Sequence, residues 1–193
     1  QNERVLEKGN ICFMFAQKYH AAMRFVGPVR KGIGLRTVFN ILGPLSNPAQ
    51  ANAELMGVYS EELVEPMAHV LNNLGIKRAL VVYGQDRLDE ISMSAPTTCV
   101  EVRDGKFERY VIMPEQFGLK RCQKSELTGG DGIENAKITE RIFKGECTDA
   151  KADAVILNAG AGIYLMGGAS NITQGVEIAR ETIRSGKAYE TLQ

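Results

Sequence analysis

The chain has 193 residues, which is enough for one well-buried core and near the upper range of a typical domain. Apolar residues make up 44% and charged residues 24%, a globular composition that argues against intrinsic disorder. Lysine plus arginine equals aspartate plus glutamate, 23 each, which excludes a global basic field of the kind that holds nucleic acid or an anionic membrane. The balanced totals do not exclude a local basic patch over residues 18–36.

The cysteines and histidines argue against a zinc protein. Four cysteines lie far apart with no paired ligand spacing, and only two histidines accompany them. Free thiols in a reducing compartment are the simpler interpretation, so we expect a cytoplasmic protein. No apolar run approaches the ~20 residues of a membrane span, and no secretion signal opens the chain. The absence of an initiator methionine indicates a processed, trimmed or partial chain.

The N-terminal quarter is punctuated by glycine and proline and predicts only short helices. Apolar residues at helical spacing favour helices at residues 3–17, 19–27 and 37–42. Gly9 weakens the middle of the first of these, because glycine is a poor helix former. Gly43-Pro44 should end the third.

A strand–helix–strand unit and a hairpin come next. A short strand at residues 54–59 precedes a helix at 63–74, and residues 79–83 (ALVVY) form the continuous apolar run of a strand buried on both faces. The predicted buried stripe of the helix is Met67, Val70, Leu71 and Leu74. Residues 97–113 hold two alternating runs around Asp104-Gly105, which predicts an antiparallel hairpin.

The last third of the chain predicts three helices. Asp131 is a helix N-cap with a glutamate three residues on, the pattern of a capping box. Residues 154–166 are apolar nearly all round, which predicts a buried helix, and Gly160 and Gly162 suggest close packing there. Residues 172–184 form an amphipathic helix.

These elements together predict one α/β domain over residues 1–193. The order of strands and helices favours a three-layer, mostly parallel sheet with flanking helices and an appended antiparallel hairpin.

The first candidate site is the basic stretch, residues 19–49 (YHAAMRFVGPVRKGIGLRTVFNILGPLSNPA). Glycine lets the backbone approach a ligand closely, and proline fixes φ. The pair Gly43-Pro44 therefore favours a backbone segment of defined shape that forms one wall of a ligand site. Arg30 offers a planar fork of donors to a carboxylate or phosphate. The alternative is a pair of basic helices in which Arg24, Arg30 and Arg36 are simply solvated.

The second candidate site is residues 84–92 (GQDRLDEIS), directly after the buried strand. In parallel α/β sheets ligands bind at the carboxyl ends of strands. Asp86, Asp89 and Glu90 cluster there and suit Mg²⁺, which takes one or two protein carboxylates and completes its shell with water and substrate phosphates. The alternative is a solvent-exposed acidic loop.

The basic stretch resembles the signature stretch of the anthranilate phosphoribosyltransferase family. The family usually reads His-Pro-Ala-Met at its start, where this chain has Ala21 in place of the proline. The resemblance continues in order to the end of the chain. It runs through LVEPMAHVLNNLG, ALVVYG, LDEIS, APTT, PEQFGL, GGDGIENA, LNAGAGIYLMGGA and GVEIARETIRSGKA.

The resemblance implies phosphoribosyl transfer from phosphoribosyl pyrophosphate to the amine of anthranilate, with Mg²⁺, on the catalytic-domain fold shared by nucleoside phosphorylases and phosphoribosyltransferases. It implies that Arg30 contacts the anthranilate carboxylate and that Asp89 and Glu90 bind magnesium. Further anthranilate contacts implied in the same way are Gly43, Pro44, His20 and Met23. No protein nucleophile is required, which fits two histidines without an evident nucleophile partner.

The chain departs from the family pattern in one large respect. The family's phosphoribosyl pyrophosphate elements, a GTGGD loop, an N-x-S-T segment and a KHGN loop, do not occur in it, nor does the N-terminal helical domain through which the family usually forms homodimers. We therefore expect a C-terminal, larger-domain portion that folds but is catalytically deficient alone. The alternatives are a pyrimidine nucleoside phosphorylase, a nucleic-acid-binding relative of the same fold, and a folding or assembly module.

Overall fold

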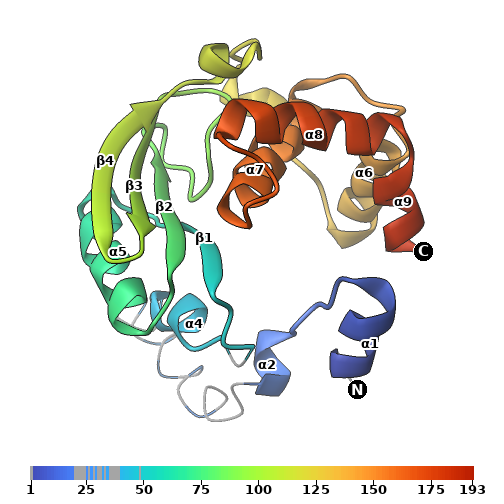
Figure 1. Cartoon of the computed structure of the whole chain (residues 1–193). Helices are drawn as coiled ribbons and strands as arrows, with labels where there is room; N and C mark the ends of the chain where they lie inside the picture. The colour runs from blue at the N-terminus through green and yellow to red at the C-terminus, as the bar shows by residue number, and fades with distance from the viewer. Residues whose placement is uncertain are drawn as a thin grey trace. The chain divides into compact units, whose positions relative to one another are not determined.

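The computed structural model describes residues 2–19, 25, 27, 29, 32, 34, 40–47 and 49–193 (Figure 1). The chain divides into two compact units, Gln1–Gln50 and Ala51–Thr191. The basic stretch belongs to the first unit and the acidic loop to the second. A single domain over residues 1–193 stays a prediction.

The first unit contains, among its described residues, the short helices α1 (Asn2–Gly9), α2 (Ala16–Tyr19) and α4 (Leu42–Leu45). The prediction of one helix over residues 3–17 is wrong. α1 ends at Gly9, and Asn10 follows with φ 57°, in the left-handed region that terminates helices. Glycine is a poor helix former and asparagine tolerates the left-handed region, so these two residues end the helix together.

Gly43 and Pro44 lie inside α4, so the predicted helix stop at this pair is wrong. Pro44 is the third residue of α4, and a backbone N–H in the first turn has no intrahelical partner to lose. Residues 20–24 and 35–39 lie outside the described residues. Most of the helix predicted at 19–27 and half of the helix predicted at 37–42 therefore lie outside them as well.

The second unit is built on a sheet in the order β1-β2-β3-β4. Its strands are β1 (Ala53–Gly57), β2 (Arg78–Gly84), β3 (Thr97–Arg103) and β4 (Lys106–Ile112). β1 and β2 are parallel, and the other two pairings are antiparallel. Asp104 and Gly105 connect β3 to β4 with φ values of 48° and 79°, the left-handed turn that hairpins favour. The predicted hairpin is confirmed.

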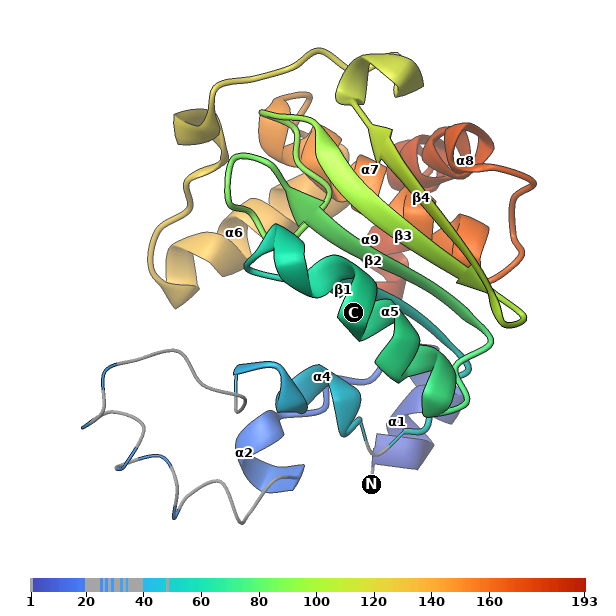
Figure 2. The same ribbon diagram turned by 90° about the vertical axis from the view of Figure 1, so that its left-hand side faces the viewer.

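Helix α5 (Val64–Asn73), preceded by the 3-10 turn η2 (Glu61–Leu63), covers one face of the sheet (Figure 2). It packs against β2 and β3. Its buried residues are Val64, Met67, Ala68 and Leu71. Leu74, predicted to be buried, is 57% exposed because it caps the helix rather than continuing its apolar face.

The last third of the chain supplies the helices of the other face. They are α6 (Gly132–Phe143), α7 (Ala150–Leu165), α8 (Ile172–Arg184) and α9 (Lys187–Leu192), after the 3-10 turns η3 (Pro114–Phe117) and η4 (Lys124–Leu127). Both views place α7 and α8 on the side of the sheet opposite α5 (Figures 1 and 2). The three-layer arrangement with flanking helices is therefore confirmed for the second unit. The prediction of a mostly parallel sheet is wrong for the described strands, because only β1 and β2 pair in parallel and the hairpin joins β2 in antiparallel fashion.

The main hydrophobic core lies between the sheet and helices α7 and α8. Leu80 and Val82 of β2 belong to it together with Leu157 of α7 and Val176 of α8, all almost fully buried. Side chains alternate along a strand, so the equally buried Ala79 and Val81 face the α5 side. β2 is thus buried on both faces, as its continuous apolar run predicts.

Helices α7 and α8 meet through backbone at two glycines. A Cβ added at Gly175 would lie 2.1 Å from the carbonyl oxygen of Gly160, and one added at Gly160 would lie 2.6 Å from the backbone nitrogen of Val176. Gly160 packs closely, as expected. Gly162 does not, because nothing lies within 4 Å of the position its Cβ would occupy.

A buried glutamate ties the hairpin to α7. Glu101 of β3 is 8% exposed and accepts hydrogen bonds from the hydroxyls of Tyr164 (2.8 Å) and Tyr110 (2.9 Å). The Arg103 guanidinium donates to the same carboxylate at 2.8 Å. Burial, followed by the neighbouring Glu101 charge, raises the pKa of Tyr110, so this tyrosine stays a donor at any ordinary pH. The network fixes the position of α7 against the sheet.

In the part of the chain that the structure describes, no helix has the length and apolar character needed to cross a bilayer.

Candidate functional site

The acidic loop leaves the carboxyl end of β2 through a tight turn. The Gly84 amide donates to the Leu88 carbonyl at 2.8 Å, and the Arg87 amide donates to the Gly84 carbonyl at 2.8 Å. Arg87 adopts φ 70°, a left-handed conformation that is uncommon for a residue with a side chain. The loop then returns to β3, which is antiparallel to β2. The whole segment therefore stays at the end of the sheet where β2 ends and β3 begins.

Asp86 braces the loop from inside. Its Oδ2 atom accepts hydrogen bonds from the hydroxyls of Ser92 (3.0 Å) and Ser94. The Ser92 hydroxyl in turn accepts the backbone N–H groups of Ser94 and Ala95, at 3.0 and 3.1 Å. This carboxylate is therefore engaged within the loop, and the structure does not bring it together with the other two acids of the predicted cluster as a metal-ligand group.

Asp89 and Glu90 lie at the exposed surface of the loop. The end of β1 supports the backbone beneath them: a Cβ at Gly57 would lie 1.6 Å from the Asp89 carbonyl oxygen. Only glycine permits this approach. The sequence prediction missed Gly57, although a glycine at the carboxyl end of a strand is a signal of close backbone approach.

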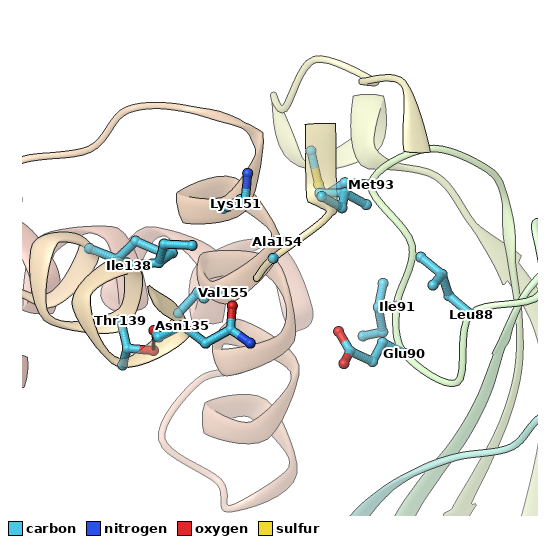
Figure 3. Close-up of a pocket in the computed structure, with 13 residues that line it drawn as sticks. Leu88, Glu90, Ile91, Met93, Asn135, Ile138, Thr139, Lys151, Ala154 and Val155 are labelled. Carbon is cyan, nitrogen blue, oxygen red and sulfur yellow. Dashed lines mark hydrogen bonds between the residues drawn. The ribbon is translucent and has the colours of Figure 1, made fainter. Parts of the chain in front are cut away.

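A cavity of about 360 Å³ opens beside Glu90. Figure 3 shows Glu90 on one side of it and Asn135 and Thr139 of α6 on the other. Most other lining side chains are apolar, among them Ile91 and Met93. The sequence prediction missed this cavity because its walls come from the acidic loop, α6 and α7, which are far apart in the chain.

The polar groups facing Glu90 across the cavity are already paired. Asn135 accepts from the Gly130 amide at 2.9 Å and donates to the Gly130 carbonyl at 3.0 Å. The Lys151 ammonium donates to the Glu126 carbonyl at 2.8 Å. Glu90 is thus the acid that the cavity presents to a ligand among its described lining residues.

The electrostatics of the acidic pair favour a cation. Partial burial, and next the adjacent Asp89 charge, raise the pKa of Glu90. A divalent cation would remove this repulsion between the two carboxylates. Among the residues that the structure describes, no group of three or more His, Cys, Asp or Glu side chains could hold a metal. Two carboxylates fit Mg²⁺, which usually takes the rest of its shell from water and phosphate oxygens.

The predicted anthranilate-binding residues fall in the first unit. His20, Met23 and Arg30 lie outside the described residues, so their roles stay predictions. Gly43 and Pro44 are placed in α4. In the second unit, the predicted N-cap is confirmed: one Asp131 carboxylate oxygen accepts the N–H groups of Ile133 and Glu134, both at 2.9 Å.

Comparison with known proteins points to one family. The family model described as "Glycosyl transferase family, a/b domain" matches residues 1–189. The anthranilate phosphoribosyltransferase of Lachnoclostridium phytofermentans is 53% identical over 100% of this chain and 57% of that protein. The enzyme of the same name from Methanobrevibacter smithii is 51% identical over 98% of this chain and 56% of that protein.

Solved structures give the same result. The crystal structure of anthranilate phosphoribosyltransferase from Thermus thermophilus superposes with a TM-score of 0.93 at 46% identity, covering 99% of this chain and 56% of that one. The Saccharomyces cerevisiae enzyme, in complex with phosphoribosyl pyrophosphate and Mg, gives a TM-score of 0.83 at 30% identity, covering 90% and 50%. The chain spans a little over half the length of the curated relatives it matches. Because the family model covers nearly every residue, the chain belongs to the glycosyl transferase family, as an α/β domain.

Proposed function

We propose that this chain is the larger-domain, C-terminal portion of an anthranilate phosphoribosyltransferase, which makes phosphoribosylanthranilate and pyrophosphate in tryptophan biosynthesis. The observation that carries the proposal is the 53% identity that extends over the whole chain. The exposed acidic pair beside a cavity at the end of β2 is consistent with it.

The chemistry assigns separate tasks to the two units. When bound, Mg²⁺ neutralises the charge that grows on the departing pyrophosphate. Asp89 and Glu90 would hold it, which requires both side chains to be ionised. Arg30 would orient anthranilate through its carboxylate, so that the weakly basic amine faces the sugar carbon that is losing pyrophosphate. Gly43 and Pro44 would form the aromatic slot, with His20 and Met23 along its approach.

The partners follow from the same proposal. The substrates are anthranilate and phosphoribosyl pyrophosphate, and the rest of the longer protein supplies the phosphoribosyl pyrophosphate loops and the homodimer contacts. The location we propose is the cytoplasm, since Cys12, Cys99, Cys122 and Cys147 are all free thiols.

We expect the full-length protein that carries this chain to form phosphoribosylanthranilate, and the 193-residue chain alone to form it far more slowly. The measurement is the loss of anthranilate fluorescence with phosphoribosyl pyrophosphate and Mg²⁺ present. Phosphorolysis of thymidine by the full-length protein, with no use of anthranilate, would instead identify a pyrimidine nucleoside phosphorylase. A fast reaction by the 193-residue chain alone would disprove the expectation that it is catalytically deficient without the rest of the longer protein.

In the full-length protein, Arg30→Ala should raise the KM for anthranilate by roughly 10- to 100-fold. A charge-assisted hydrogen bond of about 1.5–3 kcal/mol is lost. The KM for phosphoribosyl pyrophosphate should change little. Arg141→Ala is a matched control, because the exposed side chain of Arg141 in α6 makes only a 4.0 Å ion pair with Glu146 among the described contacts. Equal effects on both substrates would remove Arg30 from the anthranilate site.

A further inference from the structure

We propose that Asn158 is a positioning residue, which holds the Asp89–Glu90 backbone in the geometry that binds a divalent cation. The inference rests on the proposed function of that pair. Asn158 lies in α7, and its amide pairs with both backbone groups of Ile91, the residue after Glu90. Its Oδ1 atom accepts from the Ile91 N–H at 3.0 Å, and its Nδ2 atom donates to the Ile91 carbonyl at 3.0 Å.

The Asn158 side chain is itself held in place. Its Nδ2 atom also donates to the Ala154 carbonyl one turn earlier in α7, at 3.0 Å. Both amide hydrogens are therefore used, and the side chain is pinned to its own helix while it binds the loop. Asparagine in a helix interior is less favourable than alanine by roughly 0.7 kcal/mol. The two bonds to Ile91 give a reason for a polar residue in the otherwise apolar stretch of α7 that begins at Ala154.

The acidic pair is anchored on its other side as well. The carbonyl of Leu88, just before Asp89, accepts the Gly84 amide at 2.8 Å. The Asp89 carbonyl rests against Gly57 at the end of β1. Asp89 and Glu90 are thus two exposed residues whose backbone is held on both sides, and only their side chains remain free to bind a ligand.

Loss of the Asn158 clamp should weaken cation binding without removing a ligand. Two adjacent carboxylates repel each other, so an unanchored backbone would let them separate. Mutation of a partner that orients a metal ligand typically lowers the metal affinity by 10- to 100-fold. The same change should leave Asp89 and Glu90 chemically intact, which separates a positioning role from a ligand role.

The test uses Asn158→Leu in the full-length protein, with Mn²⁺ alone as the probe. Mn²⁺ binding is followed by water-proton relaxation, and amide hydrogen exchange is followed by mass spectrometry over residues 84–97. We expect the Mn²⁺ dissociation constant to rise about 10- to 100-fold and exchange to increase in that segment. In the assay, the Mg²⁺ concentration for half-maximal rate should rise while the KM for anthranilate changes little.

Matched variants keep the proposal testable. Gly57→Ala displaces the Asp89 carbonyl from the opposite side and should give the same loss of Mn²⁺ affinity if Asn158→Leu does not fold. Gly162→Ala, in α7 with open space around it, should change nothing at the loop. Asn171→Ala removes the N-cap of α8 and controls for lost stability alone.

Three outcomes would overturn the proposal: no Mn²⁺ binding by the wild-type protein, unchanged affinity in Asn158→Leu, or an equal loss of affinity in Asn171→Ala. The Mn²⁺ and exchange measurements need no turnover. They therefore decide the role of Asn158 even if the protein fails to use anthranilate, an outcome that would count against the proposed function alone.

Discussion

Gly175→Ala should destabilise the protein by about 2 kcal/mol, as measured by urea unfolding followed by circular dichroism. The added methyl would lie 2.1 Å from the Gly160 carbonyl oxygen, which belongs to the backbone of α7 and cannot rotate away. Helices α7 and α8 would have to separate, and forcing extra atoms into a packed core costs about 1–3 kcal/mol or more. The better helix propensity of alanine offsets up to ~1 kcal/mol of this.

Gly162→Ala is the control for the same substitution in the same pair of helices. Nothing lies within 4 Å of its added Cβ, so only the propensity gain remains, and stability should rise by about 0.5–1 kcal/mol. The two variants should therefore have opposite signs. A Gly175→Ala protein as stable as the wild type would show that α7 and α8 do not meet through backbone at this point.

The backbone of the second unit could be predicted from sequence where the signal is local. The hairpin depends on Asp104-Gly105, whose turn chemistry needs no tertiary information, and β3 and β4 begin and end close to the predicted points. The helix at residues 172–184 has the predicted bounds because its apolar period and its Asn171 cap agree. Two failures came from helix ends that are also local: Gly9 and Asn10 end α1, and Leu74 is the C-cap of α5 rather than part of its buried face.

The site shows the same division between local and distant information. Asp89 and Glu90 could be proposed because they lie in the loop that follows a buried strand and match the acidic pair of the family, and their metal-binding role stays a prediction. Asn158 could not, since it is 67 residues from Ile91 in the chain, and only the fold brings them together. A lone amide in the apolar stretch after Ala154 was the available signal, but the sequence does not show which backbone groups it would bind. The assignments to Arg30, His20 and Met23 rest on resemblance and stay predictions.

Glu90→Gln should make the protein more stable near pH 7 and at the same time impair its use of Mg²⁺. Partial burial and the Asp89 charge raise the pKa of Glu90 above its ordinary value of 4.5, so ionisation of this group opposes folding. The stability that the protonated form contributes is fully present below the unfolded-state pKa, and is lost as the pH rises through the higher folded-state pKa. A neutral glutamine avoids that loss. The stabilisation should therefore appear near pH 7 and vanish at about pH 3, where the native glutamate is protonated as well, as thermal unfolding at the two pH values would show.

Glu54→Gln separates the two effects of this substitution. Glu54 lies in β1, and burial raises its pKa too, so its replacement should also stabilise the protein near neutral pH. It is not part of the acidic pair, so the Mg²⁺ requirement should not change. Under the proposed function Glu90 is a direct ligand, so Glu90→Gln should raise the Mg²⁺ requirement at least as much as the roughly 10-fold that loss of an orienting partner costs. If Glu90→Gln is more stable but has an unchanged Mg²⁺ requirement, Glu90 is not a metal ligand, and the repulsion between the two carboxylates has another explanation. Greater stability with impaired Mg²⁺ use would show that the protein retains two adjacent carboxylates, at a cost to its own folding, because they bind the metal.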